Sequence, residues 1–159
     1  MLIRIGFALL ALSAVVGCNN SESDKGTAGT SPAASPQVAD SVALLGSWDV
    51  VAVEEDGTVK SPEKVKGSLF TFTADTMSVL QAGRPKPDEM KYRLDEAKKF
   101  IDAEDVGHSR KSVGIYELKG DDLRICINDK PNSTERPTGF KTEPKSPNGI
   151  VFTLKRAPK

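Results

Sequence analysis

The stretch SVGIYELKGDDLRICI, residues 112–127, gives the clearest indication of how this chain folds. Near its end, Leu123, Ile125 and Ile127 recur at every second position. A period of two is typical of a β-strand that buries one face. Gly120 lies in a short polar loop between this pattern and the apolar stretch before it, and such loops connect the strands of hairpins. Residues 112–127 are therefore predicted to form a β-hairpin.

The same signals recur from residue 44 to the end of the chain. In residues 90–95 and 150–155, large apolar side chains also occupy every second position. Four more segments are rich in β-branched or aromatic residues or flank turns, which favours strands. These segments are residues 47–55, 68–73, 76–81 and 99–104. The count is about eight strands at spacings near ten residues, as in a sandwich or a barrel.

One short helical turn is expected near residue 62. Ser61 fits the capping position, Pro62 fits the first helical position and Gly67 fits the position after the last turn. Asp56-Gly57 supplies the positive-φ residues of a tight hairpin. Because consecutive hairpins favour a meander, the predicted fold is all-β, a lipocalin-like up-and-down antiparallel β-barrel with one short helical turn. Such a barrel has room for packed side chains or one small ligand.

The first residues are typical of an export signal. Arg4 precedes an apolar run of about a dozen residues, too short for the roughly 20 that span a bilayer. The run ends in Val15-Val16-Gly17-Cys18, which resembles the bacterial lipoprotein signal box of the signal-peptidase-II type. Residues 1–17 are therefore predicted to be a lipoprotein signal peptide and Cys18 the lipidated residue. The alternative is a plain signal peptide whose cysteine is incidental.

Residues 18–43 are predicted to be the lipidated cysteine followed by a disordered tether. Residues 19–40 are rich in Ser, Ala, Gly, Pro, Asn and Asp and hold no aromatic residue. Such a composition cannot bury enough apolar surface to offset the entropy of ordering. The domain organisation is thus a signal peptide, a tether and a β-barrel over residues 44–159, placed outside the cytoplasm as a membrane-anchored lipoprotein of the cell envelope.

Charge and cysteine content exclude some classes of function. The chain of 159 residues has 22 Lys plus Arg and 22 Asp plus Glu, and no basic run stands out. Binding to nucleic acid through phosphates is therefore not expected. Cys126 has no disulfide partner if Cys18 carries lipid. We expect a monomer held together by its core and hydrogen bonds.

Three pieces of the β-rich region carry a resemblance to a known family. They are LLGSWDVVAVEEDG (44–57), VGIYELKGDDLRICIND (113–129) and ERPTGF (135–140). Together they resemble a bacterial, planctomycete-type lipocalin-like domain of unknown function. The matching residues are Gly46, Ser47, Trp48, Gly114, Ile115, Tyr116, Gly120, Asp121, Leu123, Arg124, Ile125, Cys126, Arg136, Pro137, Phe140, Leu154, Lys155 and Arg156. The resemblance covers almost the whole β-rich region and implies a barrel fold without implying an activity.

The family is in turn loosely similar to true lipocalins. In those, the tryptophan of a Gly-x-Trp strand closes one barrel end beneath a basic residue that follows the last strand. By position, this similarity assigns these parts to Trp48 and Arg156, with Lys155 as the alternative. Arg124 and Arg136 stand in the other family motifs, and we expect them to form structural ion pairs at the barrel mouth.

Aromatic side chains on the predicted strands are the candidates for the wall of a ligand cavity. These candidates are Trp48, Tyr92, Tyr116 and Phe152. Each also suits a plain core, because large aromatic side chains dominate the packing of barrel interiors.

Residues with catalytic chemistry do not form a recognisable set. Cys126 shares its face of the strand with Arg124, and a nearby cation lowers the pKa of a thiol. Catalysis by a thiolate also needs a base, and the sole histidine in the sequence is His108. We interpret Cys126 as a small packed apolar residue, and we expect the chain not to be an enzyme.

Two further patterns match known sites only in part. Asp102, Glu104 and Asp105 lie near His108, but a calcium loop needs a denser set of oxygen ligands and a defined glycine. SPEK (61–64) matches the Ser-x-x-Lys of serine acyl-enzymes, but the other two motifs of that class are missing. We therefore expect neither a metal ion nor a cofactor.

The sequence thus predicts a membrane-anchored binding or interaction module. Its expected partners are the membrane, through Cys18, and a small, partly apolar ligand if the barrel holds one. The alternative is a filled barrel that docks other envelope proteins, with an enzyme in third place. An internal cavity of at least a few hundred Å³ favours the carrier, and a filled interior favours docking.

Overall fold

The computed structural model describes residues 38–128, 130–143 and 149–158. The predicted signal peptide (1–17), Cys18 and the predicted tether up to residue 37 lie outside the described residues. The described residues belong to one compact unit, Pro36–Lys159. Among them, no helix combines the length and apolarity needed to cross a membrane.

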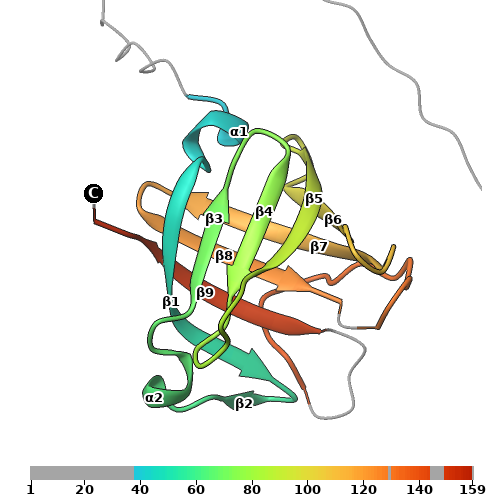
Figure 1. Cartoon of the computed structure of the whole chain (residues 1–159). Coiled ribbons are helices and arrows are strands. Elements are labelled where there is room, and N and C mark those ends of the chain that lie inside the picture. Colours follow the sequence, from blue (N-terminus) through green and yellow to red (C-terminus); the bar gives the residue numbers. More distant parts are fainter. Residues whose placement is uncertain (1–37, 129, 144–148, 159) are drawn as a thin grey trace, which may run out of the picture. The chain divides into compact units, whose positions relative to one another are not determined.

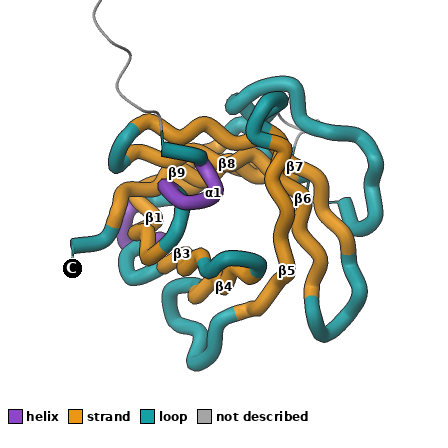
Figure 2. Tube along the Cα trace, turned by 90° about the horizontal axis from the view of Figure 1, so that it is seen from above, coloured by secondary structure: helices purple, strands orange, loops and turns teal. Residues whose placement is uncertain are grey.

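All eight predicted strands are present and pair in chain order. They are β1 (Gly46–Glu55), β3 (Leu69–Phe72), β4 (Thr76–Leu80), β5 (Asp88–Asp95), β6 (Phe100–Asp105), β7 (Lys111–Lys119), β8 (Asp122–Ile127) and β9 (Ile150–Arg156). Each neighbouring pair is antiparallel, and β9 pairs with β1 from Trp48↔Arg156 to Glu55↔Ile150. The sheet closes on itself (Figures 1 and 2), which confirms the predicted up-and-down barrel.

A β-bulge in β1 explains why this segment lacks a simple alternation in the sequence. Val50 pairs with Leu154, whereas Ala52 pairs with Thr153, so Val51 is the extra residue. Val51 is exposed, and the inward positions of β1 change from even to odd numbers beyond it. A bulge bends its strand and increases its twist, which favours closure of a short barrel.

Two helical turns lie at opposite ends of the barrel (Figure 1). One is α2 (Pro62–Val65), the turn predicted near residue 62, and Gly67 has the positive φ expected after it, 84°. Ser61 occupies the N-cap position, but its side chain makes no capping hydrogen bond, contrary to the prediction. The restricted φ of Pro62 starts this turn without such a cap.

The other helical turn, α1 (Asp40–Ala43), lies in the range 18–43 that the sequence analysis assigns to the tether. It covers one end of the ring of strands (Figure 2). A two-residue strand, β2 (Thr58–Val59), was also not predicted; it pairs with the end of β1. The turn between them has positive φ at Asp56 (51°) and Gly57 (71°), as the predicted hairpin requires.

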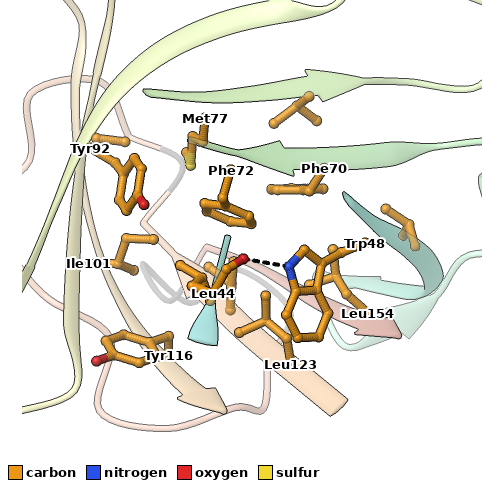
Figure 3. Packing of buried hydrophobic residues seen from close by; sticks show 14 of the residues in the cluster. Leu44, Trp48, Phe70, Phe72, Met77, Tyr92, Ile101, Tyr116, Leu123 and Leu154 are labelled. Carbon is orange, nitrogen blue, oxygen red and sulfur yellow. Dashed lines mark hydrogen bonds between the residues drawn. The ribbon is translucent and has the colours of Figure 1, made fainter. Parts of the chain in front are cut away.

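The inward faces of the strands fill the barrel with apolar side chains (Figure 3). Leu44, just after α1, points into this core beside Trp48 and Leu123. The predicted alternations are confirmed, because every second residue of β5, β8 and β9 contacts this core. These residues are Met90, Tyr92, Leu94, Leu123, Ile125, Ile127, Ile150, Phe152 and Leu154. Burying one large apolar side chain stabilises the fold by about 1.5–3 kcal/mol.

Gly114 provides a test of the tight contact between β7 and β8. A Cβ at this position would lie 2.5 Å from the carbonyl oxygen of Cys126, a backbone atom held in the sheet. We expect Gly114→Ala to lower the free energy of unfolding by about 2–3 kcal/mol, as for other overpacked sites. Urea unfolding followed by circular dichroism measures the change.

Gly139→Ala is the matched control, because a Cβ at Gly139 meets no atom within 4 Å. We expect it to change the free energy of unfolding by less than about 0.5 kcal/mol. Equal losses in the two variants would contradict the close approach of β7 and β8 at Gly114.

Candidate functional site

Trp48 and Arg156 close the end of the barrel that α1 covers. Trp48 is fully buried, and its indole Nε1 donates a 2.8 Å hydrogen bond to the carbonyl oxygen of Leu44 (Figure 3). Trp48 and Arg156 are cross-strand partners, and the guanidinium lies 4.1 Å from the centroid of the indole ring. Such a cation–π contact contributes about 0.5–2 kcal/mol.

Arg156 also joins the first described residues of the chain to the last. Its guanidinium donates hydrogen bonds to the carbonyl oxygens of Ala43, at 2.5 Å, and Leu45, at 3.1 Å. It also pairs with Asp121 in the turn between β7 and β8, at 3.0 Å. One side chain therefore ties together α1, the tryptophan and a hairpin turn.

Lys155, the predicted alternative to Arg156, does not lie over Trp48 and points toward solvent. Its side chain is 62% exposed and its ammonium pairs with Asp122 at 2.9 Å. This salt bridge raises the pKa of Lys155 above its ordinary value. Arg156, and not Lys155, lies across Trp48.

Carboxylates fasten α1 to the rim of the barrel. Asp40 is 7% exposed and accepts hydrogen bonds from the Tyr116 hydroxyl, at 2.7 Å, and from the Lys99 ammonium. The Glu96 carboxylate accepts the backbone N–H groups of Asp40 and Ser41, each at 3.0 Å. Hydrogen bonds from Ser41, followed by that from Asp40, lower the pKa of Glu96. A negative charge is thereby held at the start of this turn.

Three of the four predicted wall residues fill the barrel rather than line a cavity inside it. Trp48 and Tyr116 belong to the packed α1 end. Tyr92 is also buried, and its hydroxyl donates a 2.7 Å hydrogen bond to the Thr73 carbonyl oxygen. Burial raises the pKa of Tyr92, and more strongly that of Tyr116. Phe152 alone of the four lines the interior pocket described next.

A pocket of about 170 Å³ lies at the α2 end of the barrel. Its apolar walls are Val50, Val53, Phe70, Val79, Ile150 and Phe152 from the strands, with Val65 from α2. The basic side chains of Lys60 and Lys64 also line it. Ligand sites for drug-sized molecules usually measure about 300–1,000 Å³, whereas an engineered cavity of about 150 Å³ binds benzene. The interior thus has room for one group of roughly that size.

The structure places Arg124 and Arg136 on the outer surface of the barrel and not at its mouth. Arg136 pairs with Asp102 at 2.7 Å and lies over the ring of Phe100, 4.2 Å from its centroid. Arg124 donates a 3.0 Å hydrogen bond to the carbonyl oxygen of Phe140 and lies 4.6 Å from the centroid of that ring. These arginines fasten the segment after β8 to the wall.

Cys126 faces away from the core and is nevertheless fully buried. Burial raises the pKa of its thiol to about 11, against a smaller lowering effect of Arg124. The thiol is therefore protonated at neutral pH. The thiolate that a nucleophile requires is disfavoured here.

The acidic residues weighed as metal ligands do not converge. Asp102 is engaged in the ion pair with Arg136, and Glu104 lies 3.9 Å from Lys111. Asp105 instead contacts His108 Nδ1 at 3.3 Å. Within the described ranges, no group of three or more His, Cys, Asp or Glu side chains is arranged to hold a metal ion.

The contacts of Asp40, Glu96 and Lys99 were missed by the sequence analysis. The partners are 55 to 76 residues apart in the chain, and no local pattern signals such a pairing. Lys60 of the interior pocket carries no distinguishing spacing in the sequence, and Lys64 stands in the SPEK pattern, which does not point to a pocket.

Comparisons with known proteins give no assignment: no protein-family model, no curated protein and no solved structure matches the chain.

Arg156→Ala tests the closure of the α1 end. The variant loses the contact with the Trp48 ring and leaves the Ala43 and Leu45 carbonyl oxygens without this donor. We expect the free energy of unfolding to fall by about 2–4 kcal/mol, measured by urea unfolding and by the fluorescence of the single tryptophan. Lys155→Ala, with its exposed ion pair, should cost less than about 1 kcal/mol. A larger loss in Lys155→Ala would contradict the assignment.

Alkylation tests the state of Cys126. With a pKa of about 11, only about one thiol in a thousand is ionised at pH 8, and the side chain is buried. We expect the peptide containing Cys126 to stay unmodified when the native chain is treated with iodoacetamide at pH 8, and to be fully modified in denaturant. Mass spectrometry of the digested chain measures both. Equally fast modification in the native chain would show an accessible, reactive thiol.

Proposed function

We propose that this chain is a lipoprotein of the cell envelope, anchored through Cys18, whose barrel acts as an extracytoplasmic binding or interaction module. The order of charge, apolar run, Gly17 and Cys18 at the start of the chain supports the anchor. The membership of a planctomycete-type lipocalin-like family is part of the same proposal, supported by the sequence motifs and by the closed up-and-down barrel.

The observation that carries the proposal is the difference between the two ends of the barrel. Trp48, Arg156 and α1 seal one end with hydrogen bonds and a cation–π contact. At the other end, a pocket of about 170 Å³ lies between apolar strand walls and α2. A barrel that serves only as a scaffold does not require this asymmetry, whereas a binding module needs one accessible end.

The pocket supports a small, partly apolar ligand, or one apolar group of a larger molecule. Phe70, Val79 and Phe152 offer apolar contacts, and a group the size of a benzene ring fills the volume. Lys60 pairs with Glu55 at 2.7 Å, while no ion pair of Lys64 is found among the described residues. A ligand with a polar or negatively charged end therefore suits the basic side of the pocket.

The second candidate is a filled barrel that docks other envelope proteins. It is favoured by the packed core, which extends from the α1 end through Trp48, Phe72 and Tyr92. The interior pocket also falls below the few hundred Å³ expected of a carrier. Retention of a ligand separates the two candidates.

Native mass spectrometry of the full chain purified from its own host provides the test. We expect a retained small ligand in the unmodified chain, and its loss in Val79→Phe, whose larger side chain fills the pocket. Val79→Ala, which enlarges the pocket, is the matched control and should keep the ligand. A ligand that survives Val79→Phe, or a chain that carries none, would reject the carrier and leave the docking module.

The same spectra test the anchor. We expect the mature chain to begin at Cys18 and to carry the added mass of acyl chains. A mature chain without acyl groups would reject the anchor while leaving the pocket assignment untouched.

A further inference from the structure

A second cavity, larger than the interior pocket, lies outside the barrel. It is a groove of about 670 Å³ on the outer face of β6 and β7, bounded by the segment 136–140. The lining residues of the groove are Lys98, Lys99, Phe100, Ile115, Tyr116, Glu117, Leu118, Lys119, Arg136, Pro137, Thr138 and Phe140. Its volume lies within the range of about 300–1,000 Å³ that small-molecule sites occupy, unlike that of the interior pocket.

The floor of this groove is apolar. Phe100 in β6 and Ile115 in β7 are direct cross-strand partners. The residues that follow them on the same outward faces are charged, Asp102 in β6 and Glu117 in β7. The buried core does not need this pair, because the inward positions of both strands are already filled by residues such as Ile101.

The segment 136–140 covers the apolar pair only in part. Arg136 lies over Phe100, and Arg124 holds Phe140 on the far side of the groove. Pro137 and Phe140 supply an apolar wall. The groove between them remains open, with an apolar floor and an apolar wall.

The charged lining of the groove is predominantly basic. Four basic side chains line it, against a single acidic one, Glu117. The basic residues are Lys98, Lys99, Lys119 and Arg136. Each forms an ion pair with a carboxylate. The nitrogen-to-oxygen distance is 3.0 Å for Lys98, 2.6 Å for Lys119 and 2.7 Å for Arg136. The acidic partners other than Glu117 do not line the groove.

Two of these lysines remain able to bind an anion. The side chains of Lys98 and Lys119 are 66% and 73% exposed. An ammonium has three N–H donors, so one ion pair does not exhaust it. Exposed ion pairs contribute only about 0–1 kcal/mol, so replacing the acidic partner of a lysine by the carboxylate of a ligand costs little free energy.

We propose that the groove over Phe100 and Ile115 is a binding site for a small anionic amphiphile. Its apolar body lies on Phe100, Ile115 and Phe140, and its carboxylate meets the ammonium groups of Lys98 and Lys119. The N–H donors that remain on Lys98 and Lys119 favour an anion, and the apolar floor favours an alkyl or aryl body. The site is separate from the interior pocket and does not depend on its function.

Calorimetric titration of the full chain with octanoate and with 1-octanol tests the site. Both ligands have the same number of carbons, and they differ in charge. We expect octanoate to bind about tenfold more tightly than 1-octanol, because its carboxylate forms charge-assisted hydrogen bonds. Equal affinities, or no octanoate binding, would overturn the proposal.

Three variants locate the binding. Ile115→Asp places a negative charge on the groove floor and should weaken octanoate binding at least tenfold. The double variant Lys98→Gln/Lys119→Gln, which touches no core residue, should abolish the preference for octanoate over 1-octanol. Lys91→Gln is the matched control, because Lys91 is exposed on β5 and does not line the groove. Circular dichroism verifies that each variant is folded.

Two outcomes would assign the groove differently and overturn the proposal. Octanoate binding that is lost in Val79→Phe and kept in Ile115→Asp would place the ligand in the interior pocket. A chain that sediments as a dimer, becomes a monomer on Ile115→Asp and binds no octanoate would make the groove an interface between two copies.

Discussion

The pairing of β1 with β9 is the constraint on which the rest of the structure depends. A sheet of eight strands has two free edges unless its first and last strands meet, and free edges expose unpaired backbone groups. In this chain the two strands pair from Trp48↔Arg156 to Glu55↔Ile150. The bulge at Val51 bends β1 within this pairing. Closure gives the barrel an inside and an outside, and it brings Arg156 over Trp48.

One end of the barrel is packed shut and the other holds a pocket, because the segment that leads into β1 covers only the first of them. Leu44 follows α1 into the core, and its carbonyl oxygen accepts the indole N–H of Trp48. Asp40, held by Tyr116 and Lys99, fixes the start of the described unit to the rim. At the opposite end, α2 leaves space beside Val79 and Phe152. The resulting interior has room for a small group only, which makes the outer groove the larger cavity.

The fold was predictable because the inward positions of most strands follow a period of two. Tyr92, Ile125 and Leu154 all lie where that alternation places them. The bulge interrupts the alternation in β1. The sequence places α1 in the tether because this helical turn has only four residues and follows a polar segment. The candidate site was less predictable. Arg156 and Trp48 were paired by resemblance, but Glu96, Lys99 and the Phe100–Ile115 pair act through contacts between distant parts of the chain, for which the sequence holds no local signal.

Native-state hydrogen exchange of the backbone amides in β1 and β9 tests the closed sheet most directly. If the two strands close the barrel, their slowest amides exchange only when the whole barrel unfolds, with the same opening free energy as the slowest amides of the β7–β8 hairpin. Amides of β1 and β9 that exchange rapidly through local opening, while the hairpin remains protected, would mean that the sheet is open and that Arg156 does not hold the end of the barrel shut.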